Sequence, residues 1–175
     1  MASVLRIAIL KAVFVMLLAG LSGCGFQLRG QLALPPVLER THLQVAAGER
    51  STLYQHLKAG LQVNGVSLVS DRRSATAVVE VGSESVSKQT VVKSGSGSAL
   101  EYELFYSVDF RVTGADNKVL ISQQNVRLSR DLLYDNATVI GRDTGETRAT
   151  EDMRKDAAQA ILRRIAALSS AQPAR

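Results

Sequence analysis

The sequence is short of the residues on which many functional sites depend. Its 175 residues include one cysteine, two histidines, no tryptophan and only 5% aromatic residues. A single cysteine excludes a disulfide within the chain, so packing must stabilise the fold. Two histidines are too few for a typical zinc site. Sparse aromatic residues and the lack of a basic stripe argue against a nucleic-acid interface.

The first residues have the pattern of an export signal. Arg6 and Lys11 place positive charge ahead of an apolar run over residues 12–21. That run is shorter than the roughly 20 apolar residues that a membrane-spanning helix needs. A basic start, a short apolar centre and a small-residue exit are typical of a secretory signal peptide. We therefore expect residues 1–23 to be a signal peptide that is removed.

The only cysteine follows this signal, in the order Leu21-Ser22-Gly23-Cys24. A lone cysteine is ordinarily a small buried thiol. This order, however, resembles the lipobox of bacterial lipoproteins, whose cysteine is acylated after cleavage. The resemblance implies lipidation of Cys24 and, because residue 25 is not aspartate, a lipid-anchored place on the periplasmic side of the outer membrane. Each buried methylene contributes about 0.8 kcal/mol, so stable anchoring takes more than one acyl chain.

The remainder of the chain fits one mildly basic domain. Residues 1–23 hold two of the 21 basic residues, which leaves 19 basic and 16 acidic residues and a net charge of +3. A chain of about 150 residues can bury a core of its own. We expect an acylated tether at 24–36, a single domain at 37–169 and a disordered tail at 170–175.

The first half of this domain predicts a strand and a helix. Residues 41–46 alternate in the manner of a strand. Ser51 is placed as the N-cap of a helix with leucines every four residues, and Asn64-Gly65 is a strong stop signal. Pro35-Pro36 excludes a helix before the first strand. Residues 66–69 predict a short extended piece after the helix.

Three longer β segments follow, at about 76–92, 102–112 and 119–130. The second alternates most clearly, which is typical of an antiparallel strand buried on one side. A hairpin turn at 114–118 joins the second and third segments. We expect the segments to be twisted or bulged, because they exceed the usual strand length of about 5–6 residues.

The last part of the chain predicts a long loop and a second helix. Residues 131–149 have no clean period, and loops of this length are usually functional or mobile. Thr150 is placed as the cap of a helix with one apolar face. The order β, α, β, β, β, α predicts an α+β fold, with two helices packed on one face of a four-stranded, largely antiparallel sheet.

The glycine- and serine-rich segment 93–98 links the first two strands of this meander. It lacks the Gly-Lys-Ser/Thr ending of a phosphate-binding loop, so a flexible hairpin tip is the better interpretation. Turns alternate ends in a meander, so one end of the sheet gathers Lys93, Arg130 and Arg142. These residues are candidate contacts for an anionic ligand, and the alternative is that they are ordinary solvated charges.

Little in the sequence favours catalysis. His42 and His56 are the only histidines, and His56 flanks the apolar stripe of the first predicted helix. Glu101 and Glu103 share one strand face, where solvation explains them better than an acid/base pair. No serine stands in a nucleophile elbow with partners. We therefore expect no catalytic residues, no metal site and no cofactor.

Four patches of sequence, in order and in register, resemble the LptE family of lipopolysaccharide-assembly lipoproteins. They lie at residues 23–30, 61–66, 99–103 and 156–165, and the first of them is the most specific. Together they cover both ends and the middle of the mature chain. The resemblance implies a fold of two helices against a four-stranded sheet.

The resemblance also implies a role without catalysis. Members of the family form a tight complex with LptD, the outer-membrane β-barrel of the lipopolysaccharide translocon. They plug that barrel, support its assembly and contact lipopolysaccharide during its insertion into the outer leaflet. A basic residue at the hairpin tip and one in the late loop are associated with lipopolysaccharide binding, and Lys93 and Arg142 match these positions.

Two other functions stay open. The chain is alternatively a periplasmic lipoprotein scaffold that binds another envelope protein and recognises no glycolipid. An exported enzyme is the third possibility, which the sparse catalytic inventory disfavours.

Overall fold

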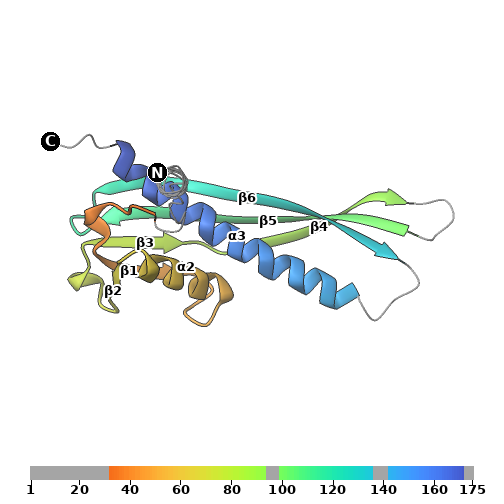
Figure 1. Ribbon diagram of the computed structural model, residues 1–175, viewed down its shortest axis with the longest axis horizontal. Coiled ribbons are helices and arrows are strands. Elements are labelled where there is room, and N and C mark those ends of the chain that lie inside the picture. The colour runs from red at the N-terminus through yellow and green to blue at the C-terminus, as the bar shows by residue number, and fades with distance from the viewer. Residues whose placement is uncertain (1–31, 94–98, 136–141, 172–175) are drawn as a thin grey trace, which may run out of the picture. The chain divides into compact units, whose positions relative to one another are not determined.

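The computed structural model describes residues 32–93, 99–135 and 142–171 (Figure 1). Cys24, the predicted signal peptide, the tip residues 94–98 and the end of the predicted tail lie outside the described residues. The elements are η1 (Pro36–Leu38), β1 (Arg40–Val45), α2 (Thr52–Val63), β2 (Ser67–Leu68), η2 (Arg72–Ser74), β3 (Ala77–Val81), β4 (Ser85–Lys93), β5 (Ala99–Gly114), β6 (Val119–Asp135) and α3 (Arg142–Ala171).

The strands form one mixed sheet. β1 lies between β2 and β3 and is parallel to both. β5 runs antiparallel to β3, to β4 and to β6. The prediction of an α+β fold with a largely antiparallel sheet is confirmed. The described sheet has six strands rather than four, because β2 is added and one predicted strand is divided in two.

That division falls within the predicted strand at 76–92. β3 pairs with one half of β5 and ends opposite Phe110, whereas β4 pairs with the other half and begins opposite Ser107. Between them the amide of Gly82 still donates to the carbonyl oxygen of Asp109, at 2.8 Å. β3 and β4 therefore follow the same edge of β5 in succession, with an irregular step at residues 82–84.

One face of the sheet carries the core. Alternate β5 side chains are at most 1% exposed; they are Leu104, Tyr106, Val108, Phe110 and Val112. The buried leucines of α2 and the apolar side of α3 belong to the same cluster, so both helices cover this face. The predicted alternation of β5 is confirmed.

The ends of α2 are set by local chemistry, as predicted. The Ser51 hydroxyl accepts a hydrogen bond from the amide of Tyr54 at 3.2 Å, which caps the first turn. After the helix, Gly65 adopts a φ of +85°, a conformation that glycine reaches without steric cost.

The turn between β5 and β6 also agrees with its prediction. The amide of Gly114 donates to the carbonyl oxygen of Lys118 at 2.8 Å, and the amide of Asn117 donates to that of Gly114 at 3.0 Å. Asn117 has a φ of 61°, which asparagine tolerates better than most residues. A tight hairpin turn follows.

The prediction of a loop at 131–149 and a helix start at Thr150 is wrong. β6 continues to Asp135, and α3 begins at Arg142. Ala149 is 5% exposed and lies one helical turn before Met153, so it continues the apolar stripe of α3. The Thr150 hydroxyl donates to the carbonyl oxygen of Glu146 at 2.9 Å, as a residue inside a helix does.

The prediction that Pro35-Pro36 excludes a helix is also wrong, because a single turn of 3-10 helix begins at Pro36. Pro36 opens the short η1, and the amide of Leu38 donates to the carbonyl oxygen of Pro35 at 2.9 Å. Proline fits a first helical position because its missing amide hydrogen has no partner there. None of the described helices is long and apolar enough to cross a membrane.

Candidate functional site

The end of β4 and the start of α3 lie at the same end of the sheet (Figure 1). Lys93 is the last residue of β4 and pairs with Leu100, which pairs in turn with Tyr134 near the end of β6. Arg142 is the first residue of α3. The backbones of Lys93 and Arg142 thus have the placement that the meander predicts. Their side chains lie outside the described part, and their role in binding stays a prediction.

Arg130, the third basic residue of the predicted group, lies further back along β6. It pairs with Leu104, four positions from the Leu100–Tyr134 pair, which corresponds to about 13 Å along a strand. Its guanidinium donates to Asp152 Oδ2 at 2.8 Å and to Asp156 Oδ2 at 3.2 Å. Two carboxylates of α3 therefore balance its charge, and an anionic ligand would have to displace them.

A second contact ties α3 to β4. Lys88 Nζ lies 2.5 Å from Glu146 Oε2 and 5.4 Å from the centre of the Tyr102 ring. No prediction from the sequence involved Lys88. Lys88 pairs with Leu104 and therefore lies on the apolar side of the sheet, which the helices cover. A lysine in that position indicates that a carboxylate on one of the helices pairs with it.

Among the ion pairs of the described residues, the most buried lies at the step between β3 and β4. Glu84 Oε2 accepts from Arg154 Nε at 2.7 Å and from the Tyr106 hydroxyl at 3.1 Å, and Arg154 also meets Glu151 at 2.7 Å. The Glu84 side chain is 11% exposed. Burial and the nearby Glu84 carboxylate raise the pKa of Tyr106 well above its usual value. The neutral hydroxyl is therefore kept as a donor.

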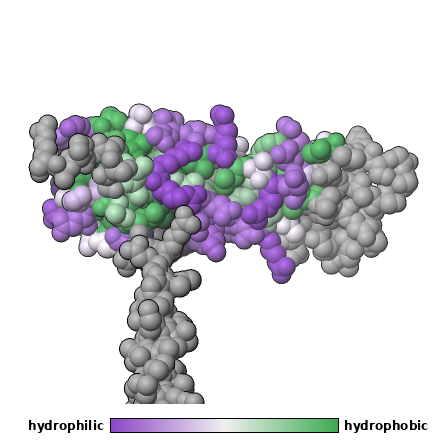
Figure 2. Space-filling model, turned by 45° about the horizontal axis from the view of Figure 1, so that its top comes forward, coloured by the Kyte–Doolittle hydropathy of each residue, from purple (hydrophilic) through white to green (hydrophobic). Residues whose placement is uncertain are grey.

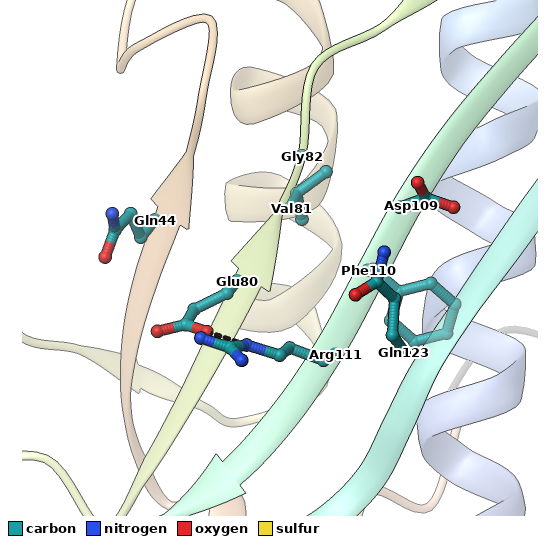
Figure 3. Close-up of a pocket in the computed structure, with 8 residues that line it drawn as sticks. All are labelled: Gln44, Glu80, Val81, Gly82, Asp109, Phe110, Arg111 and Gln123. Carbon is teal, nitrogen blue, oxygen red and sulfur yellow. Dashed lines mark hydrogen bonds and ion pairs between the residues drawn. The ribbon is translucent and has the colours of Figure 1, made fainter.

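A hollow of about 250 Å³ with a mixed polar and apolar lining lies on the sheet face that the helices leave open (Figure 3). In its lining, the Glu80 carboxylate accepts a hydrogen bond from Arg111. The same carboxylate accepts from Arg72 NH1 at 2.8 Å. The hydrogen bond from Arg111 lowers the pKa of Glu80. Gln44, Asp109 and Gln123 complete the polar part of its lining. Because the Glu80 charge is already matched, the hollow is best explained as an ion-paired patch that joins neighbouring strands.

The described residues offer no arrangement typical of a reaction centre. His42 Nδ1 lies 3.0 Å from the carbonyl oxygen of Val69, which ties β1 to the segment after β2. His56 is half-buried on α2. Within the described ranges, no three acidic, histidine or cysteine side chains come together as a metal site would require. The described residues instead form a helix that ion pairs attach to the sheet. The surface is polar, and hydrophilic residues spread across the middle of the face in Figure 2.

Comparison with known proteins gives a consistent result. A model of the LptE family, described as lipopolysaccharide-assembly, matches residues 38–165. The LPS-assembly lipoprotein LptE of Yersinia enterocolitica is 27% identical over 166 residues, which is 90% of this chain and 78% of that protein. LptE of Yersinia pestis is 27% identical over 154 residues, or 86% and 72% of the two chains.

Two solved structures share the fold. The solution NMR structure of lipoprotein B from Nitrosomonas europaea has a TM-score of 0.68 and 33% identity, and the match covers 84% of this chain and 94% of that one. The crystal structure of a minor lipoprotein from Acinetobacter baumannii has a TM-score of 0.63 and 27% identity, with 76% and 94% covered.

Proposed function

The chain belongs to the LptE family of lipopolysaccharide-assembly lipoproteins, and we propose on that basis that it is the plug of an LptD-type β-barrel. The family assignment confirms the predicted resemblance and the predicted part in lipopolysaccharide transport at the outer membrane. The family is one of lipoproteins and not of enzymes. In this proposal the chain supports assembly of the barrel and contacts lipopolysaccharide on its way into the outer leaflet.

The observation that carries the proposal is the set of ion pairs that attach α3 to the sheet. A plug must keep its shape inside a polar barrel lumen. Ion pairs from α3 reach three places on the sheet: Glu146 meets Lys88 on β4, Arg154 meets Glu84, and two aspartates meet Arg130 on β6. Such a body has a polar exterior, and its helix is held to the sheet by these pairs together with the apolar face of α3 that packs in the core.

Lys93 and Arg142 are the proposed contacts for lipopolysaccharide. They belong to element ends that share one end of the sheet, and lysine and arginine recognise phosphate as a point charge and as a two-donor clamp. Arg130 is the third proposed contact, provided that the ligand displaces Asp152 and Asp156. The proposed anchor is an acylated Cys24, which holds the chain on the periplasmic side of the outer membrane.

Two experiments test these points. Pull-down from solubilised outer membranes recovers a large β-barrel with this protein if the plug proposal holds, and recovery of the free protein alone overturns it. A mass spectrum of the mature protein shows acyl chains on residue 24, whereas an unmodified Met1 overturns the anchor.

Lipopolysaccharide recognition is tested by charge reversal. Lys93→Glu and Arg142→Glu weaken lipopolysaccharide binding by about tenfold or more, since each replaces attraction by repulsion. Lys118→Glu is the matched control, because this exposed lysine lies in the turn at the other end of β5. Unchanged binding in the first two variants would favour the alternative, a lipoprotein scaffold without glycolipid recognition.

A further inference from the structure

β6 forms a long border of the sheet (Figure 1). From the pair of Gln124 with Phe110 to the pair of Asp135 with Ala99, its ladder with β5 has no shift. In the described part of the chain, β6 pairs with β5 alone. Its other side therefore presents backbone donors and acceptors along residues 124–135.

The other two borders of the sheet have features that discourage an added strand. β2 is only two residues long. β4 has a register shift between Thr90 and Val92 and carries Lys88. Short strands, bulges and lysines are the usual means by which proteins protect a sheet edge. Residues 124–135 have no register shift and contain no lysine, proline or glycine, so this stretch of the longest border lacks these protections.

One hydrogen bond identifies which backbone groups of β6 point outward. Arg164 NH1 reaches from α3 to the carbonyl oxygen of Asn125 at 2.9 Å. The backbone groups of an antiparallel strand alternate between its two sides. Because the Asn125 carbonyl faces away from β5, the amides and carbonyls of Arg127, Ser129 and Asp131 face away from it as well.

The side chains beside this edge lack matching charges. Asp131 lies directly opposite Glu103 on the open face, and like charges in such a pair are destabilising. Arg127, on the same face, lies opposite Ser107. Arg127 and Asp131 are both exposed, and no ion pair engages either of them among the described residues. A strand beside β6 would remove this imbalance if it placed a cation by Asp131 and a carboxylate by Arg127.

We propose that this edge of β6 binds an extended segment of the barrel partner, which adds a strand to the sheet. The segment carries a basic residue opposite Asp131 and an acidic residue opposite Arg127. Main-chain hydrogen bonds provide the attachment, and the two charges set the register, as in other cases of strand addition. This inference rests on the proposed function, because it takes the occupant from the protein that the chain plugs.

Hydrogen exchange at single amides tests the inference on the complex extracted from outer membranes. In the isolated protein the outward amides of Arg127, Ser129 and Asp131 exchange fast, and the inward amides of Leu128 and Arg130 exchange slowly. In the complex the outward amides slow by about 100-fold or more, since each gains a stable hydrogen bond.

Ser129→Pro and Ser129→Ala form a matched pair of variants. Proline at an outward position removes the amide hydrogen but leaves the ladder with β5 intact, and alanine keeps the amide. In the complex with Ser129→Pro, the amides of Arg127 and Asp131 exchange at least tenfold faster than with Ser129→Ala. Slow exchange at Leu128 and Arg130 in both variants shows that the sheet has formed.

The outcomes separate this inference from the proposed function. Fast exchange of the outward amides in a recovered complex overturns the strand addition and leaves the plug proposal standing. Failure to recover any barrel overturns both. If the outward amides of the isolated protein exchange slowly only at high protein concentration, a second copy of the chain is the occupant. If they exchange slowly at every concentration, a segment of the same chain is the occupant. Either result overturns the assignment to the barrel.

Discussion

Arg154 donates from Nε to Glu84 Oε2 at 2.7 Å and so joins α3 to the step between β3 and β4. The same carboxylate oxygen accepts from the Tyr106 hydroxyl at 3.1 Å. Arg154 and Glu84 are 70 residues apart in sequence. One largely buried carboxylate thus links a helix, a strand and the step between two further strands.

Glu84→Ala is expected to destabilise the protein by about 2–3 kcal/mol, because it leaves the buried Tyr106 hydroxyl without its acceptor and a mostly buried Arg154 with Glu151 as its remaining partner. Arg130→Met is the comparison. Its pair with Asp152 has side chains that are 36% and 64% exposed, and exposed pairs contribute about 0–1 kcal/mol. Urea unfolding of both variants measures the difference, and equal losses would contradict this ranking of the two ion pairs.

Tyr106→Phe is expected to cost about 1 kcal/mol at neutral pH, since it removes one hydrogen bond and keeps the ring. Its effect on alkaline stability is more specific. Burial, with the Glu84 charge, raises the pKa of Tyr106 in the folded state. Above pH of about 10 the unfolded chain releases this proton while the folded chain retains it, so stability falls as the pH rises.

The variant lacks this contribution, so its stability declines less steeply in alkali. Urea midpoints at pH 8, 10 and 11 measure both slopes, and parallel slopes would exclude Tyr106 as the source.

Glu80→Gln is expected to flatten the acid side of the stability profile. The hydrogen bond from Arg111 lowers the pKa of Glu80 in the folded state, and Arg72 adds to the effect. The stabilisation is present above the unfolded pKa of about 4.3 and is lost as the pH falls through the folded value. Urea midpoints between pH 7 and pH 3 test this. Glu39→Gln is the control, because Glu39 is exposed and has no ion pair in the described structure.

Gly145→Ala is expected to stabilise the protein by about 0.5–1 kcal/mol, since alanine is the better helix former. Gly145 lies within α3, and a Cβ added there would meet no atom within 4 Å. Gly65→Ala has equally open space but a φ of +85°, so the same change is expected to cost about 1 kcal/mol there. Thermal unfolding of the two variants should move in opposite directions, and an unchanged Gly145 variant would argue against a helix at this position.

Local patterns predicted the parts of the fold that local chemistry decides. The alternation along β5, the Ser51 cap and the Gly65 stop each depend on neighbouring residues. The start of α3 was missed because Gly145 and scattered threonines hide the period that Ala149 continues toward Met153. Residue identity alone does not reveal that these positions face a sheet.

The ionic contacts were beyond such patterns for a different reason. Lys88 and Glu146 are 58 residues apart, and Arg130 and Asp152 are 22 apart. Only the path of α3 across the strands brings these pairs together. Arg130 illustrates the consequence: the meander predicted it at the end of its strand, but β6 continues to Asp135, and two carboxylates of α3 already hold its side chain.

The turn that joins β5 and β6 also affects how the chain folds. Its closure at Gly114 and Lys118 brings together residues that are near in sequence, so the entropic barrier to forming this hairpin is low. β1 and β3, by contrast, are separated in sequence by α2, so their pairing must close a much longer loop. A one-residue insertion in the turn would shift β6 by one position against β5 and turn the apolar side chains of one of the two strands to the solvent side. A few turn residues therefore determine whether both strands present their apolar side chains to the same core.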